Sequence, residues 1–546
     1  MQIDHSICLP HLTSEIVRGA RKTRLCAYAV ALEGWRRGLT LTWYTSDSPN
    51  FDNMITFGVN PPGRLFSLSS KDRTHFFFRT RGDKVSNEAV EIGADKDETK
   101  KMLAKHGVPT PMGKKFNTHH RDEEIIQYSS SIEFPLVLKP FNGSLGNGVV
   151  TNIKNQEELS KALIYVRQEL NYPEVIIERF VPGEEYRVYV IEDKVIAAYN
   201  RLAASVLGDG VHTIEELIVL KNQQKKKNPR LFSCLININK ETIDFIHQFG
   251  YTLESIPVKG EKVLLQEKTN VSAGGDPVDV TDELPEVIGQ IAIDAVKAIP
   301  GLHHGGVDII IDPNKPIEKA GVVIEINPTA QIGGILYPVK GKARDIPAAI
   351  IDYYFPETVG EPRSEMYFDF KTVLEPLESR TAIEVEVPKA PKGKIFNKKY
   401  TVSGDVQSFS YQQRLKREAH NMDLHGHIKN HMNGDIEIVV AGTSYEAVSQ
   451  FKNIINNTEY AVTKISEDYY DQPIQVGFHV TEQYLSTNLK SINVEVRKLE
   501  KELNNMEKEK KNIQKQNVKI TSSRSWGFTA PIRKAGGLFK AGTVIK

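Results

Sequence analysis

Apolar residues recur at helical spacing between residues 13 and 37, and the pattern stops at Gly38. We therefore expect an amphipathic helix over this segment. The next segment, LTLTWY (residues 39–44), is rich in β-branched and aromatic residues, which is typical of a strand. Together these elements predict a small α/β unit within residues 1–94.

Residues 134–200 are predicted to contain several short strands, a glycine-rich loop and one helix. A turn at Asp193 separates two of the strands and predicts an antiparallel hairpin. This texture is that of an α+β fold. The expected elements are the strand FPLVLKP, a glycine-rich loop, the helix QEELSKALIYVRQEL, and the strands EVIIERF, YRVYVIE and KVIAAYN.

The pattern after residue 360 predicts a domain boundary and a second folded unit. Residues 361–394 have a linker composition that includes VPKAPKG, and a new unit is expected to begin near Ile395. Residues 395–480 then alternate as strand, helix, strand, strand, helix and strand. This is the βαββαβ order of a ferredoxin-like domain.

Residues 485–520 have the heptad pattern of a coiled coil. Lys510 and Asn517 occupy a positions, where polar residues favour a two-stranded state, so we expect a parallel homodimer. The alternative is one long helix packed on its own protein. The basic tail, residues 521–546, is expected to be disordered, with a weak membrane-interface anchor as the alternative. The seam positions are Leu489, Ile492, Val496, Leu499, Leu503, Met506, Lys510, Ile513, Asn517 and Ile520.

Composition limits the function classes. The 546 residues are enough for about three or four domains. The 70 Lys and Arg residues against 69 Asp and Glu give a net charge of +1, so we expect no nucleic-acid partner. No run approaches the ~18 apolar residues of a membrane span, and the N-terminus lacks an apolar signal core. Because Cys8, Cys26 and Cys234 are too few for a disulfide framework, we expect a cytoplasmic protein.

Lys139 and the loop after it form the first candidate phosphate site. Lys139 lies at the end of an apolar strand, and Gly143, Gly146 and Gly148 follow it. Glycines allow backbone N–H groups to approach phosphates closely, and the lysine adds a positive charge. Taken alone, a glycine-rich turn between two strands is more typical of an ordinary hairpin.

Polar side chains on later strands extend the pattern. Glu178 ends a strand and Glu185 follows beyond a turn, which suits a nucleotide whose adenine meets the strand end and whose ribose meets a carboxylate. Glu325 and Asn327 share one face of a strand, and Asp308 on a neighbouring strand can join them. Oxygen ligands of this kind suit Mg²⁺. The alternative is an acidic strand pair that faces solvent.

In this order the motifs resemble the ATP-grasp superfamily of carboxylate–amine ligases. Residues 95–111 look like the segment before the nucleotide site of that family. Residues 201–222 and 263–285 are similar to the ATP-grasp parts of cyanophycin synthetases and bifunctional glutathione synthetases. The resemblance covers residues 80–356 and implies no particular product.

The resemblance implies ATP and Mg²⁺ as cofactors and assigns site residues. In such enzymes a substrate carboxylate takes the γ-phosphoryl group of ATP, and an amine then attacks the acyl phosphate. Arg201 and Arg344 are candidate carboxylate clamps, with surface ion pairing as the alternative. The implied residues are Lys96, Lys139, Gly143, Ser144, Gly146, Gly148, Glu178, Arg179, Phe180 and Glu185 for ATP, Asp308, Glu325 and Asn327 for the metal, and Lys139, Arg344 and Asn270 for catalysis.

The segments VSGDVQSFSYQQRLKREA, LHGHIKN and GDIEIVVAG resemble acylphosphatase. Asn430 matches the asparagine that orients the attacking water in that family, whereas Gln412 stands at the arginine position. A neutral amide lacks the charge that a phosphate site requires. We therefore expect weak or absent hydrolysis unless Arg414 moves into the site.

These observations predict a multidomain α+β protein with an ATP-grasp fold, a ferredoxin-like domain and a coiled-coil helix. The expected function is ATP-dependent joining of a carboxylate, on an amino acid or peptide, to an amine. The alternatives are an acylphosphatase and a nucleotide-binding scaffold. The expected division is residues 1–94 before the ATP-grasp domain, 95–360 for that domain, 361–394 as linker, 395–480 as acylphosphatase-like domain, 485–520 as coiled coil and 521–546 as tail.

Overall fold

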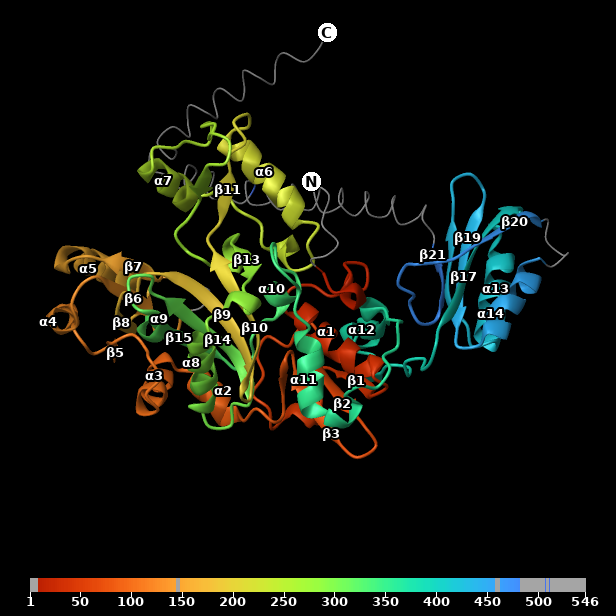
Figure 1. Ribbon diagram of the computed structural model, residues 1–546, viewed down its shortest axis with the longest axis horizontal. Coiled ribbons are helices and arrows are strands. Elements are labelled where there is room, and N and C mark those ends of the chain that lie inside the picture. Colours follow the sequence, from red (N-terminus) through yellow and green to blue (C-terminus); the bar gives the residue numbers. More distant parts are fainter. Residues whose placement is uncertain (1–7, 144–147, 457–461, 482–505, 507–509, 511–546) are drawn as a thin grey trace, which may run out of the picture. The chain divides into compact units, whose positions relative to one another are not determined.

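The structure is a computed structural model in which the chain forms two compact units (Figure 1). The first unit runs to Phe396 and includes residues 442–444 and 471–476, and the second consists of the remaining C-terminal residues. The residues that the structure describes are 8–143, 148–456, 462–481, 506 and 510.

A five-stranded antiparallel sheet with the order β16-β1-β2-β3-β4 begins the first unit. β1 confirms the strand expected over residues 39–44. The helix expected over residues 13–37 is corrected, because α1 begins only at Thr23, and 12 of its 14 residues are buried. Its nearly continuous apolar sequence buries the whole helix and leaves no polar face. The bounds are α1 Thr23–Arg36, β1 Thr40–Tyr44, β2 Leu65–Ser69, β3 Thr74–Phe78, β4 Arg81–Gly82 and β16 Glu384–Glu386.

Residues 361–394, expected as a linker, contain a helix and a strand. α12 (Phe370–Glu378) packs Phe370 against the rings of Tyr28 and Trp43, at centroid distances of 4.9 and 5.1 Å. β16 pairs antiparallel with β1. This segment therefore completes the N-terminal sheet and its core.

A four-stranded antiparallel sheet with the order β5-β8-β6-β7 carries the first candidate site residues. Leu138 and Ile177 on its inner face share a buried core with Ile125 of α4 and Leu159 of α5. The bounds are β5 Gly113–Phe116, α4 Asp122–Ile132, β6 Leu136–Pro140, β7 Val150–Ile153, α5 Gln156–Leu163, a π-helical segment Ile164–Glu169 and β8 Val175–Arg179.

The central sheet has the order β13-β10-β9-β14-β15. β9 and β10 form the hairpin expected at Asp193, since Ile191 pairs with Lys194. α8 packs on the sheet through Ile288 and Ala292, and α2 packs through Ala89. The bounds are α2 Asn87–Ala94, α3 Lys96–Lys105, β9 Glu184–Ile191, β10 Lys194–Leu202, β13 Asp276–Asp279, α8 Glu286–Lys297, β14 His304–Ile311, α9 Ile317–Ala320 and β15 Gly321–Asn327.

A small subdomain is inserted between β10 and β13. Its two strands pair antiparallel, and its helices cover a core that includes Val206, Ile218 and Val263. A capping box between Thr213 and Glu216 fixes the start of α6. The bounds are β11 Ser205–Leu207, α6 Ile214–Lys225, α7 Lys240–Gln248 and β12 Lys262–Leu264.

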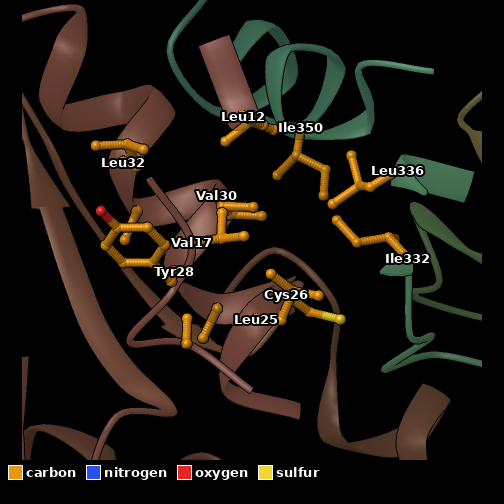
Figure 2. Packing of buried hydrophobic residues seen from close by; sticks show 14 of the residues in the cluster. Leu12, Val17, Leu25, Cys26, Tyr28, Val30, Leu32, Ile332, Leu336 and Ile350 are labelled. Atoms are coloured by element: carbon orange, nitrogen blue, oxygen red, sulfur yellow. The ribbon is translucent and has the colours of Figure 1, made fainter. Parts of the chain in front are cut away.

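The largest core of the first unit joins α1 to the segment after β15. Figure 2 shows Cys26 and Val30 of α1 facing Ile332, Leu336 and Ile350, and all five belong to one buried cluster. This packing fixes the chain just beyond Asn327 against the N-terminal sheet. The helices of this segment are α10 Gly333–Leu336 and α11 Ile346–Tyr354.

The second unit confirms the βαββαβ order expected over residues 395–480. Its strands follow the order β20-β17-β19-β18-β21, in which the added strand β21 pairs parallel with β18. Tyr411 and Leu415 of α13 and Phe451 of α14 are fully buried. The bounds are β17 Phe396–Gly404, α13 Phe409–Asn421, β18 His425–Asn430, β19 Ile436–Gly442, α14 Tyr445–Ile455, β20 Val462–Asp468 and β21 Phe478–Thr481.

The predicted coiled coil, residues 485–520, and the basic tail, residues 521–546, lie outside the described residues, apart from Met506 and Lys510. None of the helices in the described part of the chain is long and apolar enough to cross a membrane. The short 3-10 segments are Pro10–Leu12, Pro49–Phe51, Leu231–Ser233, Val271–Ala273, Thr281–Glu283 and Pro356–Thr358.

Candidate functional site

Two lysines bind the buried carboxylate of Glu178. In the antiparallel pair β6–β8, Val137 is the cross-strand partner of Glu178, so Lys139, two residues on, shares its face of the sheet. The Lys139 ammonium lies 2.6 Å from Glu178 Oε2, and the Lys100 ammonium, from α3, lies 2.7 Å from Oε1.

These contacts decide the charge at Glu178, which is 3% exposed. Burial raises the pKa of its carboxyl, but the charges and hydrogen bonds of Lys139 and Lys100 outweigh burial and leave the pKa below its usual value. The carboxylate is therefore ionised at neutral pH. Two ammonium groups against one carboxylate leave an excess of positive charge, which suits a phosphate group.

Lys96 lies at the first position of α3, after the N-cap residue Asp95. Its ammonium donates to the carbonyl oxygens of Phe141 at 3.2 Å and Gly143 at 3.0 Å. Because both acceptors follow β6, Lys96 lies at the start of the glycine loop. The first residue of α3 thus contacts the chain just after the end of β6.

The surroundings of Lys96 connect the two sheets. Burial lowers the pKa of its ammonium most, and the charge of Lys139 lowers it further, whereas the carboxylates of Glu325 and Glu178 raise it. Lys96 therefore lies within electrostatic reach of both the lysine site on the four-stranded sheet and an acidic residue on the central sheet.

The structure brings Asp308, Glu325 and Asn327 together on the central sheet. Asp308 in β14 is the direct cross-strand partner of Glu325 in β15, and Asn327 Nδ2 donates to Asp308 Oδ2 at 3.5 Å. Burial and the negative charge of Asp308 raise the pKa of Glu325. A cation between such carboxylates would relieve their repulsion.

Two arginines hold Asp308, which is 2% exposed. Arg187 binds it in a bidentate manner, with Nε 2.6 Å from Oδ1 and Nη2 2.7 Å from Oδ2, and Arg201 Nη2 lies 3.1 Å from Oδ2. Burial raises the pKa of Asp308, but the two guanidinium charges outweigh burial and lower it. Arg201 also donates to Glu185, whose second oxygen accepts from the Thr269 hydroxyl. One network thus connects the expected ribose carboxylate to the expected cation site.

Sequence reasoning missed Arg187. It follows Glu185 by two residues on β9, so the two side chains share a face, and its cross-strand partner is Asp308. The alternation of polar residues in EEYRVYV was the available signal. The pairing of β9 with β14 could not be read from that segment alone.

The glycine loop is described only at its ends. Ser144 and Gly146 lie outside the described residues, whereas Gly143 accepts the bond from Lys96. Gly148 has a φ of +70°, and a Cβ there would lie 2.7 Å from Pro140 Cγ. Glycine at 148 therefore allows the returning chain to approach the end of β6.

The strand end after Glu178 is fixed by backbone bonds. Arg179 donates its N–H to Met112 O at 2.8 Å, and Phe180 donates to Pro135 O at 2.9 Å. The Arg179 guanidinium lies 3.3 Å from Glu133. These backbone N–H groups are thus already paired with the protein.

Arg344 and Asn270 occupy structured turns. Arg344 Nη2 lies 2.8 Å from Asp279 Oδ2, and its Nη1 lies 2.9 Å from Asp282 Oδ1. Arg344 thus takes part in ion pairing, which was the alternative to a carboxylate clamp. Asn270 Oδ1 accepts from the Ser272 N–H at 2.9 Å and caps the short 3-10 turn that follows.

The acylphosphatase-like positions lie together in the second unit. Gln412 of α13 is 5% exposed, and its Nε2 donates to Asn430 Oδ1 of β18 at 2.7 Å. The amide oxygen of Asn430 is therefore engaged by a neutral donor. The charge that an arginine would supply is absent from position 412.

The oxygen set suits a divalent cation by its chemistry. No described residue donates a hydrogen bond to the Glu325 carboxylate or to the Asn327 amide oxygen, while both Asp308 oxygens accept from arginines. No cluster of three or more His, Cys, Asp and Glu side chains suited to a metal occurs among the described residues. A cation here therefore depends on the Asn327 oxygen and on phosphate oxygens as further ligands.

Comparison with known proteins identifies two family matches in the chain. Residues 93–209 match the sequence model of the RimK-like ATP-grasp domain, and residues 398–480 match that of acylphosphatase. The chain is similar to cyanophycin synthetase of Trichormus variabilis, with 36% identity over 282 residues, 51% of this chain and 31% of the relative. It is also similar to the bifunctional glutathione biosynthesis protein GshAB of Pasteurella multocida, with 32% identity over 303 residues, 53% of this chain and 39% of the relative.

Among solved structures, the chain is similar to a bifunctional glutathione synthetase from Pasteurella multocida, with 28% identity, a TM-score of 0.43, and coverage of 54% of this chain and 41% of that chain. The sequence matches define the class: the protein contains an ATP-grasp domain. That domain is of the RimK-like family, and an acylphosphatase domain shares the chain with it. Both resemblances expected from the sequence are thus confirmed. The chain spans 31% of the length of the matched cyanophycin synthetase.

Proposed function

We propose that this protein is an ATP-dependent ligase that joins a carboxylate, on an amino acid or peptide, to an amine. The observation that carries the proposal is the position of Lys96, whose ammonium donates to the carbonyl oxygens of Phe141 and Gly143 just beyond β6, the strand that carries Lys139. Besides burial, the charges of Lys139 and Glu325 also shift its pKa, in opposite directions. A triphosphate held by the two ammonium groups would therefore lie beside Asp308, Glu325 and Asn327. The homologous ATP-grasp domains of cyanophycin synthetase and GshAB support the same reaction class.

The reaction divides into two displacements. A carboxylate oxygen of the first substrate attacks the γ-phosphorus, the bond from that phosphorus to the β–γ bridging oxygen breaks, and ADP leaves. The amine nitrogen then attacks the acyl carbon, phosphate leaves with its bridging oxygen, and the amine proton passes to solvent. Such transfer needs positioning and charge neutralisation and no side-chain nucleophile.

The residues of this chain supply both requirements. Lys96 and Lys139 would neutralise phosphate charge, and glycine at 148 allows the chain to approach the end of β6 closely. Asp308, Glu325 and Asn327 would hold Mg²⁺, which when bound neutralises the charge that develops on the phosphate oxygens. Arg187 and Arg201 keep the Asp308 carboxylate in place.

The test is ATP-dependent coupling, read by product mass and phosphate release, across pairs of amino acids and short peptides. Lys139→Ala and Glu325→Ala should each lower the coupling rate by about 10²-fold or more, because each removes a charge that the transition state requires. Lys161→Ala is the matched control, since Lys161 also lies 2.7 Å from a glutamate but is 72% exposed. Full activity in either site variant would remove the assignment.

We propose the cytoplasm as the location and a homodimer as the assembly. ATP is the proposed cosubstrate, and Cys8, Cys26 and Cys234 form no disulfide in the described part of the chain, which fits a reducing compartment. The heptad pattern of residues 485–520 supports dimerisation.

A further inference from the structure

Lys100 is a third lysine at the candidate nucleotide site, and it was not among the residues predicted from the sequence. Its side chain is 12% exposed, and its ammonium lies 2.7 Å from Glu178 Oε1. Apart from this contact, neither the Lys100 ammonium nor Glu178 Oε1 has a hydrogen-bond partner among the described residues. The described polar contacts of the Lys100 ammonium are thus confined to Glu178.

Lys100 lies one helical turn after Lys96 on α3. Residues four apart on a helix share a face, so both side chains point to the same side of α3. The Lys96 ammonium contacts the chain just beyond β6, whereas Lys100, whose Cα lies about 6 Å further along the helix axis, contacts β8. Lys100 is therefore further from the glycine loop than Lys96.

The Glu178 side chain is confined to its present position. It is 3% exposed, and its cross-strand partners are Gly113 on β5 and Val137 on β6. A Cβ on Gly113 would lie 2.8 Å from Glu178 Cγ, so the glutamate occupies the space over that glycine. Because an uncompensated buried carboxylate is costly, Glu178 requires an ammonium partner at all times.

This requirement determines whether Lys139 is available to a nucleotide. Lys139 lies 2.6 Å from Glu178 Oε2, and Lys100 contacts the other oxygen. With both lysines present, Lys139 can bind a phosphate while Lys100 still neutralises the carboxylate. Without Lys100, Lys139 and Glu178 would form a neutral pair, and a phosphate would compete with the buried carboxylate for the same ammonium.

We propose that Lys100 is a positioning residue for ATP, which neutralises Glu178 and so leaves the Lys139 ammonium available to a phosphate group of the nucleotide. The inference deepens the proposed ligase function and rests on it. Lys100 acts through Glu178 and Lys139 and contacts no reacting atom. The two lysines that bind one carboxylate thus have different tasks.

The test is binding of the non-hydrolysable ATP analogue AMPPNP, with Mg²⁺, to the full chain by titration calorimetry. Lys100→Met keeps the length of the side chain and removes its charge, so it should raise Kd for AMPPNP by about tenfold or more. Lys100→Arg keeps the charge and should restore most of the affinity. Lys101→Met is the matched control, because Lys101 also lies on α3, 2.9 Å from Asp97, but is 64% exposed.

The double variant Lys100→Met, Glu178→Gln separates positioning from a structural role. Removing the carboxylate frees Lys139 from its competing partner, and the glutamine still offers an amide oxygen as an acceptor. The double variant should therefore bind AMPPNP at least threefold more tightly than Lys100→Met. If Lys100 only stabilised the fold, or contacted a phosphate directly, the second substitution would restore nothing. No recovery in a folded double variant, or unchanged affinity in Lys100→Met, would overturn the proposal.

AMPPNP binding requires no second substrate, so this test is independent of coupling. If the wild-type protein binds AMPPNP but couples no pair of substrates, the ligase function fails, and the variants still decide the role of Lys100. A wild-type protein that binds no AMPPNP would reject both. Thermal unfolding verifies that each variant folds. Should Lys100→Met not fold, Lys100→Gln replaces it: a loss of affinity that Lys100→Arg avoids supports the positioning role, and equal losses reject it.

Discussion

At the scale of single residues, His304 shows how burial fixes a protonation state. Its ring lies between two hydroxyls, with Nδ1 3.1 Å from Tyr189 Oη and Nε2 3.0 Å from Tyr354 Oη. The side chain is fully buried, and burial lowers its pKa to about 3. The neutral ring can donate to one tyrosine and accept from the other, so both bonds are satisfied without a charge.

This environment predicts a loss of stability in acid. In the unfolded chain the histidine binds a proton near its ordinary pKa of 6.5, whereas the folded protein resists protonation until about pH 3. The neutral His304 therefore contributes fully to the free energy of unfolding above pH 6.5. This contribution decreases as the pH falls toward 3, by at most about 5 kcal/mol. Urea unfolding between about pH 4 and pH 8 should show a smaller pH dependence for His304→Gln than for wild type. The same dependence in both would contradict this, and His303→Gln, at an exposed site, is the control.

At the scale of elements, the alternation of residues along a strand predicted which side chains share a face. It did not predict which strands pair with each other. Glu325 and Asn327 share a face because side chains alternate along β15, and this could be read directly. The partnership of Arg187 with Asp308 depends on the register between β9 and β14, which lie more than a hundred residues apart in sequence. β16 was hidden for the same reason, since its partner β1 lies near the other end of the first unit. Local patterns do not encode such long-range pairings.

The contact between α13 and β18 predicts that one substitution can change the chemistry of the second unit. Gln412 already lies 2.7 Å from Asn430, so Gln412→Arg would place a guanidinium where the acylphosphatase family has its phosphate-binding arginine. We expect hydrolysis of benzoyl phosphate to rise at least tenfold above wild type. The double variant Gln412→Arg, Asn430→Ala should lose that gain. A folded Gln412→Arg protein without added activity would show that charge at position 412 is not what limits hydrolysis.

At the scale of the whole molecule, the two family domains have opposing chemistry. Under the proposed function, the first unit makes an acyl phosphate, which is the kind of compound that acylphosphatases hydrolyse. An active hydrolase in the same chain would consume the ligase intermediate whenever that intermediate escaped. We expect the neutral amide at position 412 to limit this loss, because it lacks the charge of an arginine.

Self-association is a property of the whole chain. The heptad pattern of residues 485–520 predicts that dimerisation requires these residues. Met506, a seam residue, is 67% exposed in the single chain, and covering such a seam by a second copy would bury apolar surface. Light scattering should give the mass of a dimer for the full chain and of a monomer after truncation at residue 480. Truncation at residue 520 removes only the tail and should leave a dimer. A dimer that survives truncation at 480, or a monomeric full chain, would reject the coiled-coil role.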